Sequence, residues 1–167
     1  GALTASERAL AEDIFRTMAR DVEVRVRQAM MDSLKDSPEV PRDLALELAN
    51  DVAEVAVPFI EMTTVLSDDD LIEIIRSHGQ AHQLAVARRP SVSEAVSDAL
   101  VETNDEAVVA TLVANEGAQL SEATMSKVLD NFGHVRPIAT QMAERNALPL
   151  PIAERLVTLV SSKMQKR

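Results

Sequence analysis

Two histidines stand four residues apart, at His78 and His82, in a segment whose other residues suit a helix. On one helix face this spacing lets two imidazoles bind the same metal ion. A third ligand would have to come from Asp70 or Glu73, one helix earlier. The residues between the histidines are Gly-Gln-Ala, without the glutamate that a zinc protease uses as its base. We therefore expect no metal site, and we interpret His82 as a partly buried polar residue.

Arg88 and Arg89 end the same predicted helix, immediately before Pro90. Cations at a helix C-terminus complement the negative end of its dipole, which gives the pair a structural role. A second interpretation is a contact with an anion or an acidic peptide. Arg20, Arg25 and Arg27 form another small basic group, but their acidic neighbours indicate a solvated face.

The composition excludes several classes of function. The chain has 167 residues, a net charge of -10, no cysteine and three phenylalanines as its only aromatic residues. An acidic chain is poorly suited to phosphate backbones, and the lack of cysteine excludes thiolate metal sites and cysteine nucleophiles. No apolar run is long enough to span a membrane, and the N-terminus lacks a signal-peptide pattern. We expect a cytoplasmic protein without a cofactor and without a nucleic-acid or membrane partner.

The elements that would position these side chains are helices. Only four glycines occur, prolines are spread singly, and hairpin signals such as Asn-Gly are absent. Apolar residues recur three and four positions apart, as at Leu71, Ile74 and Ile75. Capping residues, Gly or Pro interrupt this pattern every 12 to 15 residues, which predicts about eleven short helices. Pro58 falls inside one of them, where we expect a kink or a split.

A repeated helix start organises the chain. A branched apolar residue followed by Ser or Pro occurs at Val40-Pro41, Leu66-Ser67, Val92-Ser93, Leu120-Ser121 and Leu148-Pro149, with spacings of 26, 26, 28 and 28 residues. Serine caps free N–H groups at a helix N-terminus, and Pro at the first helical position has no N–H to satisfy. Asp21, Asp51 and Asp105 are expected to cap the second helix of a pair.

Self-similarity at this period indicates stacked helix pairs, each of which shields the apolar face of its neighbour. We predict an all-α, right-handed HEAT-like α-solenoid of about five helix pairs, in preference to a non-repetitive bundle of short helices. It would be a single domain over 1–167, with a cap helix at 1–20, repeats at 21–147 and a final half-repeat at 148–167.

Three stretches carry a resemblance to a known family. They are Ala87–Val101, Leu66–Ile72 and Asn115–Ser121. In this order and register they resemble an uncharacterised bacterial family, domain of unknown function 2336, over roughly residues 20 to 160. The resemblance implies an all-helical, HEAT-like domain that occurs mostly in longer proteins. It brings no established activity and no catalytic residues.

The C-terminal segment is the weakest end of the predicted stack. Ile152, Leu156, Val157, Leu159 and Val160 would form an apolar face with no following helix to cover it. Such a patch drives association, so we expect this end to form a homodimer or to continue into further sequence.

The sequence thus favours a non-enzymatic scaffold for protein–protein interaction in bacterial regulation or signalling. The partner would be a basic or amphipathic protein segment. The alternative is a regulatory domain that binds a small ligand or anion near Arg88 and Arg89. A metal-dependent enzyme built on His78 and His82 ranks last.

Overall fold

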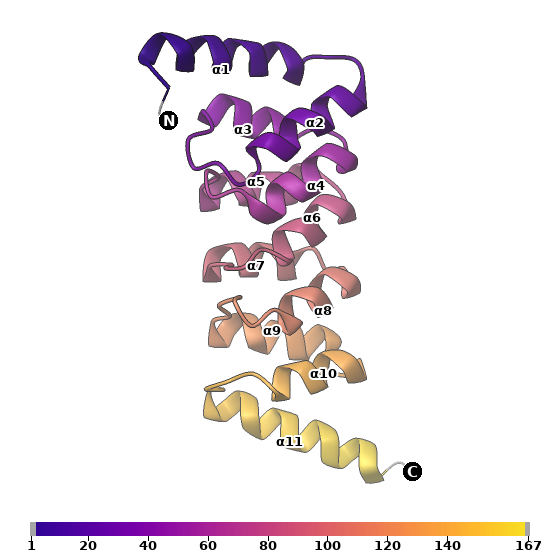
Figure 1. Ribbon diagram of the computed structural model, residues 1–167. Helices are drawn as coiled ribbons and strands as arrows, with labels where there is room; N and C mark the ends of the chain where they lie inside the picture. Colours follow the sequence, from indigo (N-terminus) through magenta and orange to yellow (C-terminus); the bar gives the residue numbers. More distant parts are fainter. Residues whose placement is uncertain (1–2, 166–167) are drawn as a thin grey trace. The chain divides into compact units, whose positions relative to one another are not determined.

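The computed structural model describes residues 3–165, apart from the side chains of residues 160 and 162–165, and this range is all-α (Figure 1). Eleven helices and no strand occur in it, as the sequence predicted. No described helix is both long and apolar enough to cross a membrane. The helices are α1 Ala5–Ala19, α2 Val24–Leu34, α3 Arg42–Ala49, α4 Ala53–Met62, α5 Asp68–Ser77, α6 Gln80–Ala87, α7 Glu94–Glu102, α8 Glu106–Ala114, α9 Glu122–Phe132, α10 Arg136–Ala143 and α11 Leu150–Gln165.

The predicted helix starts coincide with observed ones. Ser67, Ser93 and Ser121 each accept a hydrogen bond from the backbone N–H three residues later, at the starts of α5, α7 and α9. Pro41 is the N-cap residue of α3 and therefore lies one position before the helix. Pro149 directly precedes α11. The apolar residues before these starts are buried at Val40, Leu66, Val92 and Leu120 and half-buried at Leu148.

The three aspartates predicted to cap second helices behave differently from one another. Asp105 caps α8, because its carboxylate accepts the N–H groups of Ala107 and Val108. Asp51 accepts the N–H of Val52, which is itself the N-cap residue of α4. Asp21 accepts the N–H of Glu23, just before α2. Of the three, only Asp105 caps a helix in the way that the sequence predicted.

The chain divides into two compact units, Gly1–Val86 and Ala87–Arg167. In the first unit α1 packs on α2 and α3, α2 packs on α4, and α3 packs on α4. Arg42 of α3 pairs with Asp70 of α5, which ties the next helix to this group. The largest fully buried side chains of the unit belong to Met30, Met31, Leu44, Leu48, Phe59, Ile60 and Ile74.

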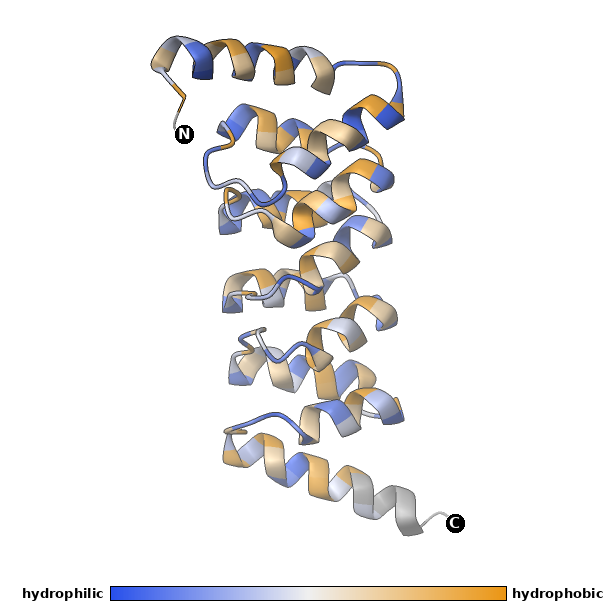
Figure 2. Ribbon diagram, in the orientation of Figure 1, coloured by the Kyte–Doolittle hydropathy of each residue, from blue (hydrophilic) through white to orange (hydrophobic). Residues whose placement is uncertain are grey.

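In the second unit α7 packs on α8 and α9, α8 packs on α10, and α11 packs on α9 and α10. Helices two places apart along the chain are therefore neighbours in both units. Hydrophobic residues recur along each helix, interleaved with hydrophilic ones (Figure 2). A helix of eight to eleven residues cannot bury such a stripe alone, so each unit depends on contacts between helices. The second unit buries Leu100, Leu112, Ile138, Met142 and Ile152 most completely.

Pro58 lies inside α4 without splitting it, contrary to one of the two expected outcomes. Proline has no N–H, so the carbonyl four residues earlier, at Glu54, loses its usual helical donor. Gln28 of α2 supplies a replacement, because its Nε2 donates to the Glu54 oxygen at 3.4 Å. A neighbouring helix thus satisfies the acceptor that the proline leaves open.

We predict that Gly117→Ala destabilises the protein, whereas Gly79→Ala does not. A Cβ at Gly117 would clash with the carbonyl oxygen of Pro90, whereas a Cβ at Gly79 would meet no atom within 4 Å. Relieving such a backbone clash costs about 2 kcal/mol. Urea denaturation of the two variants and the parent measures the difference, and equal midpoints for both variants would contradict it.

Candidate functional site

The two histidines that the sequence offered as weak candidates for a metal site stack on each other. Their ring centroids are 4.1 Å apart, and the planes differ by 9°. The Nε2 of His78 lies 2.7 Å from Oδ1 of Asn50, and the Nε2 of His82 lies 2.9 Å from the carbonyl oxygen of Asp51. Asn50 is oriented by its own amide nitrogen, which donates to the carbonyl of Leu46 at 2.7 Å. Because both partners of the imidazoles are oxygens, both Nε2 atoms are assigned as donors.

This arrangement holds helices together and is unsuited to a shared metal ion. In parallel rings the remaining Nδ1 lone pairs lie in two parallel planes and do not converge on one point. Of the two further ligands considered from sequence, Asp70 is paired with Arg42, and Glu73 accepts a hydrogen bond from the hydroxyl of Ser77 at 3.0 Å. No group of three or more His, Asp or Glu side chains placed to hold a metal occurs in the described part of the chain.

Asp51 links the histidines to α2. Its carboxylate accepts two hydrogen bonds from Arg27, at 2.6 Å from Nε and 2.9 Å from Nη2. The Nη1 of Arg27 donates to the carbonyl of Asp21 at 2.6 Å. The two side chains are 14% and 12% exposed, so the expectation of a solvated face is wrong for Arg27. The hydrogen bond to Asp51 raises the pKa of Arg27 further above its usual value.

Arg88 and Arg89 border a different network. Arg88 is exposed and Arg89 is half-buried. The Nδ2 of Asn115 donates to the carbonyls of Ala87 and Arg89, at 2.9 and 2.7 Å. The carbonyl of Arg89, and that of Ala87 just before the arginine pair, therefore accept hydrogen bonds from the loop after α8.

That loop is fixed by further hydrogen bonds. Oδ1 of Asn115 accepts the N–H of Gly117 at 2.9 Å. The N–H of Val92 donates to the Gly117 carbonyl at 3.1 Å, and the N–H of Gln119 donates to the Val92 carbonyl at 2.8 Å. These two bonds form the isolated bridge between Val92 and Ala118. The same hydrogen bonds bring the backbone of Gly117 so close to the carbonyl of Pro90 that no side chain fits at residue 117.

Arg145, at the end of α10, binds the other side of the loop. Its Nη1 donates to the carbonyls of Val113 and Asn115 at 2.9 and 3.1 Å, and its Nη2 donates to the carbonyl of Ala118. Burial lowers the pKa of Arg145 from its usual value. A cation at the C-terminal end of α8 is favourable because the helix dipole is negative there.

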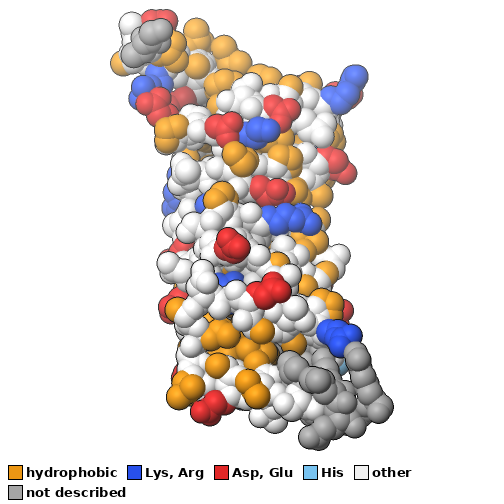
Figure 3. Space-filling model, turned by 60° about the horizontal axis from the view of Figure 1, so that its bottom comes forward, with side chains coloured by type: hydrophobic (Ala, Val, Ile, Leu, Met, Phe, Trp, Pro, Cys, Tyr) orange, Lys and Arg blue, Asp and Glu red, His pale blue; other side chains and the backbone are white. Residues whose placement is uncertain are grey.

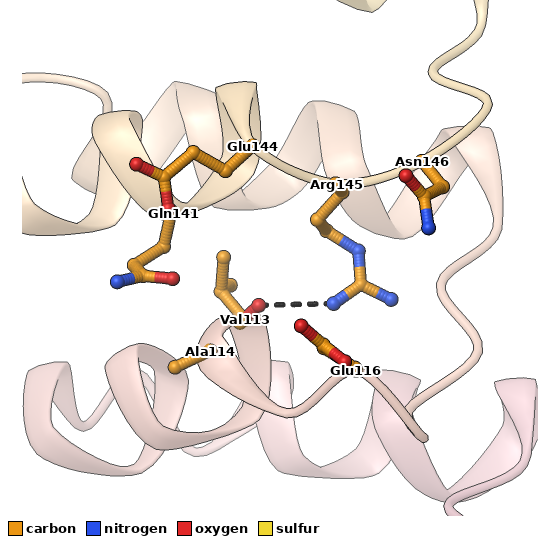
Figure 4. Close-up of a pocket in the computed structure, with 7 residues that line it drawn as sticks. All are labelled: Val113, Ala114, Glu116, Gln141, Glu144, Arg145 and Asn146. Atoms are coloured by element: carbon orange, nitrogen blue, oxygen red, sulfur yellow. Dashed lines mark hydrogen bonds between the residues drawn. The ribbon is translucent and has the colours of Figure 1, made fainter.

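A polar hollow of about 220 Å³ opens beside Arg145 (Figure 4). Glu116 lines it from the loop after α8, Gln141 lines it from α10, and Glu144 lines it from the C-cap position just after that helix. Among the described residues, none forms a hydrogen bond or ion pair with the carboxylate of Glu116 or of Glu144. The hollow therefore presents two uncommitted carboxylates next to a guanidinium already bound to three carbonyls. Its lining consists of Val113, Ala114, Glu116, Gln141, Glu144, Arg145 and Asn146.

Sequence reasoning did not single out Arg145 or Glu116. The partners of Arg145 are backbone atoms 27 to 32 residues earlier, which no side-chain motif records. A weak signal did exist, because Arg145 lies 56 residues after Arg89, which is twice the repeat spacing of 28.

The predicted C-terminal face is partly covered. Ile152 and Leu156 are buried in the second unit, where α11 packs on α9 and α10, so these two side chains do not form an open face. Leu159 is half-buried, and the side chain of Val160 lies outside the described residues. Val157, which belongs to the predicted face, is 65% exposed, and Leu150, which does not, is 70% exposed. Hydrophobic side chains gather at this end of the chain in Figure 3.

The comparison with known families agrees with the resemblance found in the sequence. The family described as "Uncharacterised protein conserved in bacteria", domain of unknown function 2336, matches residues 55–167. The chain belongs to this family. The match to domain of unknown function 2336 starts inside α4, later than the residue 20 expected from sequence, and includes the hollow beside Arg145. No curated protein and no solved structure matches the chain.

We predict that acid weakens the fold through His78. Burial and, secondarily, the charge of His82 lower the pKa of His78, so the folded state favours the neutral ring. The unfolded chain, with a histidine pKa of about 6.5, then binds the proton first as the pH falls. The contribution of His78 to the free energy of unfolding is therefore fully present above about pH 6.5 and is lost as the pH falls below it. Urea midpoints measured on both sides of this value should fall with acid, and by less in His78→Gln. An equal acid dependence in parent and variant would contradict this assignment.

We predict that Arg145→Gln destabilises the protein by about 2 to 3 kcal/mol, because buried carbonyls lose charged donors. Arg136→Gln is the matched control, since Arg136 is exposed at the N-terminal end of α10, where a cation gains nothing from the dipole. Thermal and urea denaturation measure both effects. A loss in the control as large as in the Arg145 variant would refute a specific role for Arg145.

Proposed function

We propose that this chain is a non-enzymatic, HEAT-like helical-repeat scaffold that binds a partner protein in bacterial regulation or signalling. In this proposal the helices form one right-handed α-solenoid of about five pairs. Two facts support it: helices two places apart are neighbours in both units, and the recurring helix starts are 26 to 28 residues apart. A chain without cysteine is also compatible with a reducing cytoplasm.

The observation that carries the proposal is the hollow beside Arg145. Glu116 and Glu144 are available there, on a loop and a helix end held by hydrogen bonds to Arg145 and Asn115. Rigid placement lowers the entropic cost of binding. A partner segment that carries lysine or arginine would find two carboxylates in a fixed position.

The net charge of the chain favours the same kind of partner, a basic protein segment. A charge of -10 attracts basic proteins over several ångströms and speeds their encounter. The carboxylates of the hollow would then fix the register of the bound segment. Small alanine side chains on α8, at positions 107, 110 and 114, leave room for a segment to lie close to that helix.

We predict that the double variant Glu116→Gln, Glu144→Gln captures the partner five- to thirtyfold less efficiently, since each surface ion pair contributes up to about 1 kcal/mol. The measurement is quantitative pull-down from the native cell extract, followed by titration of the identified partner. The matched control is Glu94→Gln, Glu122→Gln, which removes the same charge from the first turns of α7 and α9. Equal loss in both double variants would show that only net charge matters, and no loss in either would reject the site.

A further inference from the structure

Helix α1 lies on the first unit without burying any of its own residues. It has 15 residues and starts with a capping box at Thr4, yet none of its side chains is buried. Its inner face consists of the half-buried residues Ala11, Glu12, Phe15, Arg16, Met18 and Ala19. Phe15 and Met18 are the only large apolar side chains in that set. Apolar contact therefore attaches α1 weakly, because its contribution grows with the apolar area that is buried.

The space beneath α1 is incompletely filled. A hollow of about 150 Å³ lies there. Ala11 and Phe15 line it from α1, and Leu34, Val40 and Leu44 line it from α2, α3 and the segment between them. Side chains around an unfilled space lose part of their dispersion contacts. Helix α1 thus covers an apolar surface of the unit without packing closely against it.

Three arginines, on α1 and at its C-cap, supply the remaining attachment. Each forms an ion pair with an acidic residue of α3 or of the segment before it: Arg8 with Glu39 at 3.4 Å, Arg16 with Asp43 at 2.9 Å and Arg20 with Glu47 at 4.0 Å. In each pair at least one of the two side chains is well exposed to solvent. Exposed ion pairs are weak and are screened by salt. The attachment of α1 is therefore mainly electrostatic and easily broken.

The rest of the first unit has a core that does not involve α1. Helices α2 and α3 both pack on α4, and the side chains of Met30 and Leu48 are each 1% exposed. The segment after α1 is also held independently, because Nη1 of Arg27 donates to the carbonyl of Asp21 at 2.6 Å. Detachment of α1 would therefore end at residue 21 and leave the packing on α4 in place. A weakly buried terminal helix of this kind opens at a much lower free energy than the core.

We propose that α1 is a displaceable cap and that a helix of a partner protein binds in its place. The docking face consists of three apolar and three acidic residues: Leu34, Val40, Leu44, Glu39, Asp43 and Glu47. The occupant is an amphipathic helix with arginine or lysine at the positions of the α1 arginines, because the acidic residues already pair with that pattern. This face belongs to the first unit and is distinct from the hollow beside Arg145, so neither proposal depends on the other.

Displacement requires that the partner helix bind better than α1 does. The tether of α1 to the chain raises its effective concentration at the docking face to about the millimolar range. A competing helix compensates with a leucine or isoleucine at the position of Ala11, since such a side chain fills the hollow that the methyl group leaves open. The proposal thus specifies the charge pattern of the partner helix and one of its apolar residues.

Hydrogen–deuterium exchange of the whole chain tests whether α1 detaches. Raising the NaCl concentration from about 0.05 to about 0.5 M should speed amide exchange in α1 several-fold relative to α4, because salt screens the arginine pairs. Asp43→Asn should have the same effect at low salt, whereas the matched control Asp32→Asn, at an exposed carboxylate of α2, should not. Ala11→Leu should slow the exchange of α1. An exchange rate that ignores both salt and Asp43→Asn, or that Ala11→Leu does not slow, would overturn the proposal.

A fluorescent peptide tests the docking face directly. The peptide has the sequence of residues 3–22 with Ala11→Leu, and fluorescence anisotropy measures its binding to the whole chain. In the double variant Arg8→Glu, Arg16→Glu the acidic residues repel the chain's own α1 and leave the face open. The peptide should bind this variant about tenfold more tightly than the parent, whose tethered α1 competes.

A matched control separates the loss of α1 from the change in net charge. Arg25→Glu with Arg76→Glu makes the same charge change at two exposed positions of the first unit outside α1, and this protein should bind the peptide as weakly as the parent. A peptide with Arg8→Glu and Arg16→Glu should bind none of the three proteins. Equal affinity of the first peptide for the α1 variant and for either other protein, or undiminished binding of the second peptide, would overturn the proposal. Circular dichroism verifies that each variant is folded.

Discussion

Backbone carbonyls at helix ends are the groups on which both units depend. Each short helix leaves its last carbonyls without an internal partner, and burying them unpaired is costly. Side chains from a later helix or loop supply the donors. His82 reaches the Asp51 carbonyl after α3, Asn115 reaches Ala87, and Arg145 reaches Val113. Apolar packing would allow short helices to slide past one another, whereas these directed bonds fix one register.

Ion pairs between alternate helices add a second set of links. Arg16 pairs with Asp43, and its guanidinium lowers the pKa of that carboxyl, as Arg42 does for Asp70. In the first unit the cation belongs to the earlier helix. In the second unit it belongs to the later one, as in the pair of Arg155 with Asp130 at 2.7 Å. Both units thus have ion pairs between alternate helices, although the cation is on the earlier helix in one unit and on the later helix in the other. These ion pairs engage arginine side chains within the protein. Because the chain has more Asp and Glu than Lys and Arg, the charged groups that stay available to other molecules are mainly carboxylates.

The helix starts were predictable because capping is local. Ser67, Ser93 and Ser121 each bond a backbone group three residues away, so a short stretch of sequence contains both partners. Arg27 and Arg145 were not predictable in this way. The carboxylate that Arg27 binds lies 24 residues away in the chain, and the groups that Arg145 binds are distant carbonyls of a kind that every residue possesses. The helix periodicity and the recurring helix starts predicted the all-α class, and the family resemblance agreed with it. Neither pointed to the hollow beside Arg145, because its carboxylates follow no motif.

Pro58 and Gln28 depend on each other although thirty residues separate them. The ring that removes a donor from α4 creates the acceptor at Glu54 that the glutamine uses. Replacing Pro58 would restore the helical hydrogen bond to the Glu54 carbonyl, so that the amide of Gln28 would lose its acceptor. Shortening Gln28 would instead leave the Glu54 carbonyl without a protein donor. Neither change is neutral by itself. Evolutionary drift at these two positions is therefore expected to be correlated, as a pair of compensating substitutions.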